Sequence, residues 1–322
     1  MTSAAEGRVV VWRIRDGKTG HEHQSQGLVR ALGRLIPVEP HDLEARSNLS
    51  AIGDLLFRRF PSGQTLPDPH LIVGAGHATH LSLLAARRAR GGRVVVLMRP
   101  SLPLAWFDLC IIPEHDGVYE RPNVISTQGV LNEIQNSARP RRDQGLFLIG
   151  GTSTHYHWDE EAVLAQVQTV LAACPYLRWQ LTDSRRTPAT TSRALAGLGA
   201  GQVCFMPHAD TDRGWLTEGL AVAQAVWVTE DSVSMVYEAL SSGAAVGLLR
   251  VPRRGSNRVT AGIDALLGRG LITAYEAWAR GAPLRVPTPL LAEAARCAQM
   301  IVERWGLGSA PRPVIRLAVK IG

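Results

Sequence analysis

The sequence predicts an α/β protein of two domains, each built on a parallel sheet, with a cleft between the two sheets. The chain has 322 residues, of which 45% are hydrophobic and 20% are charged, and this length suffices for two domains of ordinary size. Short apolar runs alternate with helical stretches through the first half, and the same alternation returns in the second half. Near-continuous apolar runs are typical of strands that are buried on both faces, as the strands of parallel sheets are.

The predicted strands follow these apolar runs in order along the chain. They are residues 9–14, 71–73, 94–98 and 109–112 in the first half, and residues 146–149, 177–181, 203–206, 226–228 and 245–249 in the second. Helical segments such as residues 160–172 lie between them, and right-handed crossovers then make both sheets parallel. The polar, proline-bearing segment 136–144, NSARPRRDQ, marks the seam, so we divide the chain into an N-terminal domain of residues 1–140 and a C-terminal domain of residues 141–322.

The net charge and the composition indicate which kinds of partner the protein could bind. The formal net charge of +7 implies attraction to anions, but the arginine clusters are not interleaved with aromatic residues, so nucleic acid is not expected as a partner. No apolar run approaches the roughly 20 residues that span a bilayer, and the first residues lack a signal-peptide pattern, so we expect a cytoplasmic protein. A peripheral position on an anionic membrane surface, at the inner face of the cytoplasmic membrane, is a further option. The 4 cysteines are far apart, which favours buried free thiols.

The stretch 226–251, VWVTEDSVSMVYEALSSGAAVGLLRV, predicts a strand, a polar loop, a helix that ends at Gly243 and a second strand. Asp231, Ser232 and Ser234 fall at the start of this helix, where unpaired backbone N–H groups and the helix dipole favour a phosphate. Seven residues beyond Asp231, Glu238 is placed to accept hydrogen bonds from two neighbouring sugar hydroxyls. In the alternative interpretation, Asp231 or Ser232 only caps the helix and Glu238 is solvated.

Four successive strands of the first half are followed by glycine or ionisable residues, at the sheet edge where open parallel sheets bind ligands. The candidate residues there are Asp16, Gly17, Lys18, Gly20 and His21 after the first strand, Gly74, Gly76 and His77 after the second, Arg99 after the third, and Glu114 and His115 after the fourth. A single histidine is more often structural than catalytic, but several on one edge favour a site. Neither the phosphate-loop order of ATPases nor the dinucleotide-binding glycine order is present.

The second half carries its own candidate residues for binding phosphate. Gly150, Gly151 and Ser153 follow a strand and either wrap an anion or form a tight turn. Arg185 and Arg186 follow the next strand and suit a pyrophosphate, with a solvated surface as the alternative. Asp210-Thr211-Asp212 has a spacing that can hold a divalent metal, but we favour a helix cap there, and no metal or cofactor is predicted.

The chain resembles the bacterial members of the mitochondrial fission ELM family from about residue 9 to about residue 310. The motifs that carry the resemblance are DGKTGHEHQSQGL, GAGHATHLSLLAARR, RPSLPL, PEHDG, TQGVLN, LIGG, TDSRRTP and TEDSVSMVYEALSSG. The family implies the GT-B fold of nucleotide-sugar glycosyltransferases, in which two Rossmann-like domains face an interdomain cleft.

The last of these motifs is similar to the donor-binding segment of the lipid-II-forming N-acetylglucosaminyltransferase. That likeness implies that the backbone of residues 232–235 holds the donor diphosphate and that Glu238 holds the ribose hydroxyls. The donor-binding residues expected from this loop are Glu230, Asp231, Ser232, Val233, Ser234, Met235 and Glu238. The loop 17–21 resembles that enzyme's N-domain glycine-rich loop, although Asp16 and Lys18 replace part of the glycine run.

From these features we predict a GT-B glycosyltransferase-like enzyme that transfers a sugar from a nucleotide-sugar donor to a cell-envelope glycan or lipooligosaccharide, without a metal and with inversion. The predicted catalytic base is His77 or His21, with Glu114 or Asp16 as further candidates. Arg185, Arg186 and the helix start would neutralise the leaving group. Two alternatives stay open: a non-catalytic protein that recruits a partner at a membrane, and a nucleotide-sugar epimerase on the same fold.

Overall fold

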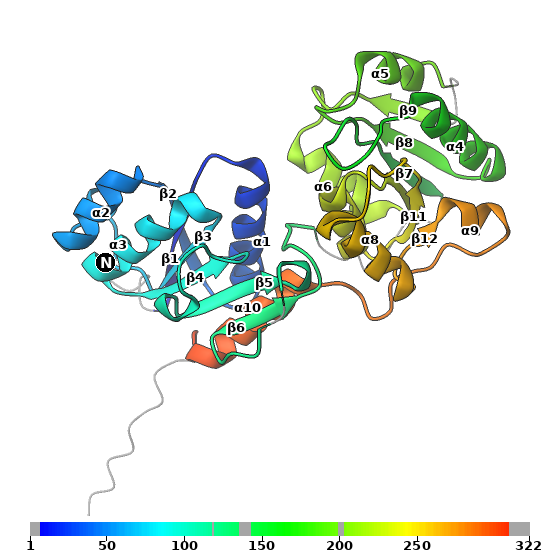
Figure 1. Ribbon diagram of the computed structural model, residues 1–322. Helices are drawn as coiled ribbons and strands as arrows, with labels where there is room; N and C mark the ends of the chain where they lie inside the picture. Colours follow the sequence, from blue (N-terminus) through cyan, green and yellow to red (C-terminus); the bar gives the residue numbers. More distant parts are fainter. Residues whose placement is uncertain (1–6, 118, 135–142, 199–202, 309–322) are drawn as a thin grey trace, which may run out of the picture.

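The computed structural model describes residues 7–117, 119–134, 143–198 and 203–308. They form two six-stranded sheets in which all neighbouring strands are parallel, and helices alternate with the strands (Figure 1). The predicted α/β class with two parallel sheets is therefore confirmed. The predicted seam at 136–144 falls mostly on residues 136–142, which lie outside the described residues.

The first sheet has the strand order β2-β1-β3-β4-β5-β6. Its strands are β1 (Val9–Arg15), β2 (Val38–Glu44), β3 (Leu71–Ala75), β4 (Arg93–Leu97), β5 (Leu109–Pro113) and β6 (Val124–Thr127). The four central strands were predicted, whereas β2 and β6 were not. Both lie at an edge, and the sequence of β2, VEPHDLE, has only one buried residue. An edge strand has one solvated side and accepts charged residues and proline, so it lacks the apolar signal of a central strand.

The second sheet has the strand order β12-β11-β10-β7-β8-β9. Its strands are β7 (Gln144–Leu148), β8 (Arg178–Thr182), β9 (Val203–Met206), β10 (Ala225–Thr229), β11 (Ala245–Leu249) and β12 (Thr273–Ala274). Every strand predicted for the second half is present, with shifts of one or two residues at some ends. Only β12 was missed, because a two-residue edge strand carries no periodic pattern.

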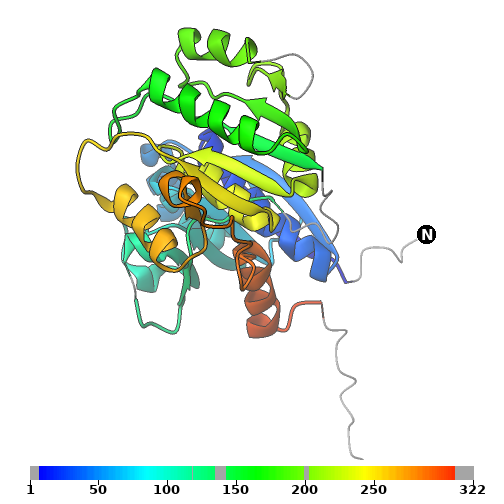
Figure 2. The same ribbon diagram turned by 90° about the vertical axis from the view of Figure 1, so that its right-hand side faces the viewer.

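Helices cover both faces of each sheet (Figures 1 and 2). They are α1 (Thr19–Leu35), α2 (Asn48–Leu56), α3 (His80–Arg90), α4 (Glu160–Ala173), α5 (Ala189–Ala196), α6 (Arg213–Val222), α7 (Val233–Ser242), α8 (Arg258–Gly268), α9 (Tyr275–Ala279) and α10 (Glu293–Trp305). In the first sheet, α1 and α10 pack on one face and α3 on the other. In the second sheet, α7 and α8 pack on one face and α4 on the other. No helix of the described ranges is long and apolar enough to cross a membrane.

The last helix, α10, returns from the second half of the chain to the first sheet. Cys297, Ala298 and Ile301 are buried in the same core as Leu28 and Leu32 of α1. The sequence-based division places these residues in the C-terminal domain, and the structure packs them with the first sheet. Burying the apolar face of α10 beside α1 is what holds it there.

The cysteines are all free thiols, but they are not all buried as predicted. Cys110 and Cys297 are buried, Cys174 is half-buried and Cys204 is exposed. Cys204 lies in the edge strand β9, where one face of the residue remains open to solvent.

The two halves meet where the segment 129–134 runs between α1 and α7. A Cβ on Gly27 of α1 would lie 2.3 Å from the Asn132 carbonyl oxygen, so the helix and the segment are in close contact. The Asn132 side chain donates hydrogen bonds to the Tyr237 carbonyl at 3.3 Å and to Ser241 Oγ at 2.9 Å. These contacts tie α1 to α7, the helix that follows the motif singled out in the sequence.

Candidate active site

The candidate site lies where α1 and α7 begin, because each helix starts at the carboxyl edge of its own sheet. α1 follows β1, and α7 follows β10. His23 Nδ1 of α1 lies 4.0 Å from Glu238 Oε1 of α7, so the two helices approach each other at their second turns. The loops at the carboxyl edges of both sheets are thereby brought to the same region, where parallel sheets bind ligands.

Asp16 and His21 form a hydrogen-bonded pair at the edge of the first sheet. Asp16 Oδ2 lies 2.8 Å from His21 Nδ1, and the carboxylate is only 2% exposed. The Lys18 N–H donates to the other carboxylate oxygen at 3.1 Å. A carboxylate that accepts from Nδ1–H fixes the tautomer and leaves Nε2 free to accept a proton. Two residues predicted separately as candidates thus form a unit suited to general-base chemistry.

Gly76 brings the loop after β3 against this pair. Its φ is +82°, and a Cβ there would lie 2.3 Å from the His21 ring and 3.1 Å from Asp16 Oδ2. Only glycine permits both that backbone conformation and that contact. Gly17 also has a positive φ, +76°, at the turn that leads into α1, whereas Gly20 lies within α1 with open space beside it. Gly74 is inside β3 and packs on Leu83, away from the pair.

The other candidates of the first edge are placed differently. His77 is exposed, and its side chain forms no hydrogen bond or ion pair with the described residues. Glu114 pairs with Arg269 Nη2 at 2.8 Å and so links the two halves. His115 lines a cleft beside Tyr237 and Arg269 that has an empty volume of about 640 Å³. The exposed Arg99 guanidinium lies 5.7 Å from the centre of the Tyr119 ring. The structure therefore favours His21 over His77 and Glu114 as a base.

Gly150 and Gly151 form a packed turn, and their amides do not face a ligand. The Gly150 N–H donates to Thr229 Oγ1 at 2.7 Å, and the Gly151 N–H donates to Asp231 Oδ2 at 3.0 Å. A Cβ on Gly150 would lie 2.4 Å from the Asp231 carboxylate, and one on Gly151 would lie 2.1 Å from the Arg186 carbonyl oxygen. The structure therefore favours the tight turn over an anion-wrapping loop.

Asp231 and Arg186 are partners beneath this turn. Arg186 Nη2 lies 2.9 Å from Asp231 Oδ2, and Nη1 donates to the Thr152 carbonyl at 2.9 Å. Burial raises the pKa of Asp231, whereas the Gly151 N–H and Arg186 oppose that rise. Asp231 does not cap α7, since the N-cap residue is Ser232 and no side chain accepts a capping hydrogen bond there. The charge of Arg186 is thus largely balanced inside the protein.

Glu230 and Ser153, which were also predicted to contact the donor, interact with other residues of the protein, whereas the Arg185 side chain has no hydrogen-bond or ion-pair partner among the described residues. Glu230 is 1% exposed and pairs with Arg253 Nη2 at 3.1 Å. Burial raises the pKa of Glu230, and the charge of Arg253 opposes that rise. Ser153 Oγ accepts a hydrogen bond from the His155 N–H at 3.3 Å. The Arg185 side chain is exposed and open to an anionic ligand.

The start of α7 is the part of the predicted donor site whose backbone donors are available. The helix has 10 residues and begins at Val233, as the sequence predicts, and Gly243 ends it in the left-handed conformation with a φ of +80°. The first-turn N–H groups of Val233, Ser234 and Met235 have no partner within a helix. Ser234 is exposed, so a ligand can reach this turn.

Glu238 is turned toward the first half of the chain. Its side chain is 14% exposed and lines a cavity with His23, Glu133 and Thr217. Burial raises the pKa of Glu238 to about 7, and the charge of Glu133 adds to the rise. The alternative in which Glu238 is fully solvated is thus wrong.

The Asp-x-Asp motif caps a helix, as we favoured. Asp212 is the N-cap of α6 and accepts a hydrogen bond from the Trp215 N–H at 2.7 Å. Among the residues that the structure describes, no three or more His, Cys, Asp and Glu side chains gather as a metal site.

One hydrogen-bonded pair of an aspartate and a histidine near the second sheet edge was not predicted. Asp183, after β8, lies 2.9 Å from His208 Nδ1, after β9, and also accepts a hydrogen bond from Ser192 Oγ at 2.5 Å. Burial opposes ionisation of Asp183, but the hydrogen bonds from Ser192 and His208 outweigh it and lower the pKa. Asp183 directly follows β8 and His208 lies two residues after the end of β9, and this position after a strand end is the signal that sequence reasoning could have used.

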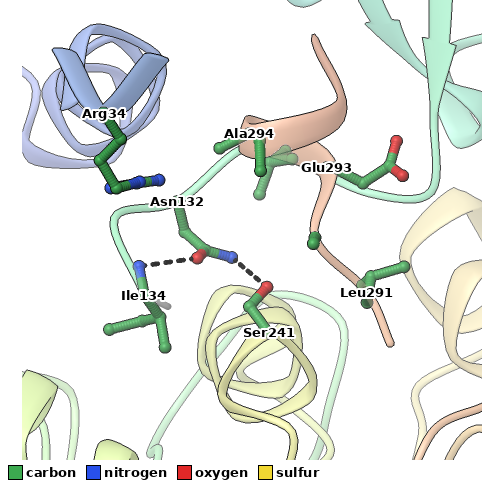
Figure 3. A pocket seen from close by; sticks show the side chains of 10 residues that line it. Arg34, Asn132, Ile134, Ser241, Leu291, Glu293 and Ala294 are labelled. Atoms are coloured by element: carbon green, nitrogen blue, oxygen red, sulfur yellow. Dashed lines mark hydrogen bonds between the residues drawn. The ribbon is translucent and has the colours of Figure 1, made fainter. Parts of the chain in front are cut away.

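A further cavity lies at the opposite ends of α1 and α7 (Figure 3). Arg34, Asn132, Ser241 and Glu293 line it, and its empty volume is about 660 Å³. Because α1 and α7 both end here, it lies away from the carboxyl-edge loops and outside the candidate site.

Comparison with known proteins identifies relatives that match most of the chain. A family model described as mitochondrial fission ELM1 matches residues 19–305. An uncharacterized protein of Rickettsia prowazekii (strain Madrid E) is 23% identical over 303 aligned residues, which cover 76% of this chain and 84% of that protein.

Solved structures show the fold. A putative UDP-N-acetylglucosamine 2-epimerase from Listeria monocytogenes matches with a TM-score of 0.59 at 12% identity, covering 93% of this chain and 97% of that one. The UDP-GlcNAc 2-epimerase from Neisseria meningitidis, bound to UDP-GlcNAc, matches with a TM-score of 0.53 at 9% identity, covering 92% and 99%. The two facing parallel sheets of this chain are therefore a GT-B fold, as the resemblance implied.

Proposed function

The chain belongs to the mitochondrial fission ELM1 family, and from this premise we propose that it is a glycosyltransferase-like enzyme that uses a nucleotide-sugar donor. The proposed acceptor is a hydroxyl group of a cell-envelope glycan or lipooligosaccharide. The observation that supports this best is the Asp16–His21 pair at the carboxyl edge of the first sheet, on the same helix α1 whose His23 approaches Glu238 of α7. Glu238 is four residues beyond Ser234, so at 1.5 Å per residue the contact with α1 lies roughly 6 Å along the helix from its first turn.

The donor diphosphate is proposed to bind at the first turn of α7. Three backbone N–H groups and the positive end of the helix dipole suit an anion there, and the exposed Arg185 adds a mobile charge. Glu238 would accept the ribose hydroxyls when the donor replaces its contact with His23. The Neisseria protein holds UDP-GlcNAc on the same fold, which supports a nucleotide-sugar ligand of this class.

In the proposed reaction, the acceptor hydroxyl loses its proton to His21 Nε2 as its oxygen attacks the anomeric carbon of the donor sugar. The bond from that carbon to the diphosphate oxygen breaks, and the nucleoside diphosphate leaves with the electron pair. Asp16 stabilises the imidazolium that forms, and the α7 N–H groups stabilise the leaving charge. Attack opposite the leaving group inverts the anomeric carbon. No step in this scheme requires a metal.

The Asp16–His21 pair supports an enzyme over a protein that only recruits a partner. Burying a carboxylate costs free energy, and a surface that only recruits a partner gains nothing from orienting a histidine in this way. An epimerase would also move protons, and its product distinguishes it, since it forms a free nucleotide-sugar isomer without any acceptor.

The test is nucleotide release from UDP-, GDP- and ADP-sugars by the purified protein, with and without an extract of envelope glycolipids. We expect acceptor-dependent release with one donor, and a loss of about 10²- to 10⁴-fold in His21→Asn. His77→Asn is the matched control, since that exposed histidine lacks a carboxylate partner, and its rate should stay within a few-fold of wild type. Formation of an isomer of the free nucleotide-sugar would contradict the proposed sugar transfer and would favour an epimerase. No turnover and no nucleotide binding would favour an interaction protein.

A further inference from the structure

The outer face of α2 carries an unusual group of exposed apolar side chains. Leu49, Ile52, Leu56 and Phe57 are 85%, 51%, 69% and 69% exposed. The first three are spaced by three and four residues, so they share one side of the helix. Single apolar residues on a surface are ordinary, but four within three turns form a continuous patch.

Contacts on the inner face of α2 hold the helix in an orientation that keeps the apolar patch exposed. Ala51 and Asp54 are buried, and the half-buried Leu55 packs against the core beneath α3. The Asp54 carboxylate is 0% exposed and accepts hydrogen bonds from Arg46 Nε at 2.9 Å and Arg59 Nε at 3.2 Å. Rotating the helix to hide the apolar residues would break these two ion pairs and expose Asp54. The apolar patch is therefore a stable property of the folded chain.

Positive charge borders the patch. Arg58 is exposed, and no ion pair joins it to the described residues. Arg59 is 63% exposed, and its guanidinium lies 5.6 Å from the centre of the Phe57 ring. The only acidic residue of the segment 46–59 is Asp54, which is buried. The exposed face thus combines aliphatic and aromatic side chains with the guanidinium group of Arg58, which has no ion pair among the described residues, and with that of Arg59, which shares the buried Asp54 with Arg46.

We propose that this face of α2 (Leu49, Ile52, Leu56, Phe57, Arg58 and Arg59) docks on the surface of an anionic phospholipid membrane. The helix would lie in the plane of the interface, with its apolar side chains at the boundary between headgroups and acyl chains and its guanidinium groups at lipid phosphates. Charge complementarity favours this occupant over a second copy of the chain, because a symmetric contact through α2 would bring like charges together. The proposal does not rest on the donor chemistry proposed above.

The position of α2 leaves the candidate site accessible when the face is docked. Figure 1 shows α2 at the end of the first half that is remote from the second sheet. α2 packs on α3, on the face of the first sheet opposite α1. A membrane against α2 therefore does not cover the start of α7.

The experiment is flotation of the full chain with vesicles of phosphatidylcholine alone, or of phosphatidylcholine and phosphatidylglycerol in equal parts. Wild type should float with the anionic vesicles only, and less at about 0.5 M salt than at about 0.05 M. The double variant Leu49→Ser/Leu56→Ser should weaken binding at least about tenfold. Arg58→Asn should weaken it less, and asparagine suits the positive φ of 51° at that position. Tyr176→Ser, which removes an equally exposed side chain from the second half, is the matched control.

All the substituted side chains are exposed, so each variant should fold. Thermal unfolding of each variant checks this. Absence of wild-type binding to anionic vesicles would overturn the proposal. Equal binding by the double variant would also overturn it. Sedimentation that shows a dimer broken by the double variant, with no binding to vesicles, would assign the face to a second copy instead.

Discussion

Replacing Glu238 with glutamine should remove a large part of the pH dependence of stability. The pKa of Glu238 is raised from 4.5 to about 7, mainly by burial, so the folded chain holds this proton more tightly than the unfolded chain does. The stabilising contribution of the proton is complete below about pH 4.5 and is lost as the pH rises through 7. At about 1.4 kcal/mol per pH unit, the loss amounts to about 3 kcal/mol.

Glutamine keeps the shape of the side chain and carries no charge, so Glu238→Gln should exceed wild type in stability by only about 1 kcal/mol near pH 5 and by up to about 3 kcal/mol near pH 8. Urea unfolding between pH 5 and pH 8, followed by tryptophan fluorescence, measures the difference between the two proteins at each pH. Glu120→Gln is the control, because that glutamate is exposed and should leave the pH dependence unchanged. Equal pH dependence in wild type and Glu238→Gln would refute the argument that Glu238 is buried against the first half.

Two predictions concern the turn beneath the candidate site. Gly151→Ala should destabilise the protein by about 1–3 kcal/mol, because the new Cβ meets a backbone carbonyl, whereas Gly33→Ala in open helical space should stabilise it by up to about 1 kcal/mol. Urea unfolding of the two variants decides this, and equal effects would contradict the packing described for the turn. Asp231→Ala should cost about 1–3 kcal/mol by leaving the Gly151 N–H and Arg186 without their acceptor, and exposed Asp210→Ala should be nearly neutral in the same assay. A neutral Asp231→Ala would contradict its role in holding the turn.

The fold was predictable where buried positions give a recognisable pattern of apolar residues in the sequence. The central strands read as apolar runs because both of their faces are covered, and α7 ends at Gly243 because that residue adopts the left-handed conformation. The edge strand β2 escaped prediction because its solvated side accepts Pro40, Asp42 and Glu44. The return of α10 to the first sheet depends on contacts with α1 that no local pattern reveals.

The site was predictable in its residue types but not in its pairings. Asp16 and His21 were both candidates. Their contact with Gly76 was not predictable, because Gly76 lies 60 residues after Asp16 in the sequence. Gly150 and Gly151 look like phosphate-binding glycines until their amides are found bonded to Thr229 and Asp231, about 80 residues away. The sequence indicates which chemical groups are present near a strand end. Only the folded structure shows which of these groups are already hydrogen-bonded within the protein.

The central claim is that a nucleotide diphosphate binds at the first turn of α7. The most direct measurement is thermal unfolding of wild type, Ser234→Asp and Ser234→Asn with UDP, GDP, ADP and their sugars. A ligand at about 100 times its dissociation constant adds roughly 2.7 kcal/mol to the stability of the folded state. One nucleotide should stabilise wild type and Ser234→Asn. Without ligand, Ser234→Asp should be as stable as wild type or gain about 0.3–1 kcal/mol from the helix dipole, but its new charge should abolish the ligand effect. Full stabilisation of Ser234→Asp by the nucleotide, or no stabilisation of wild type by any of them, would contradict the account.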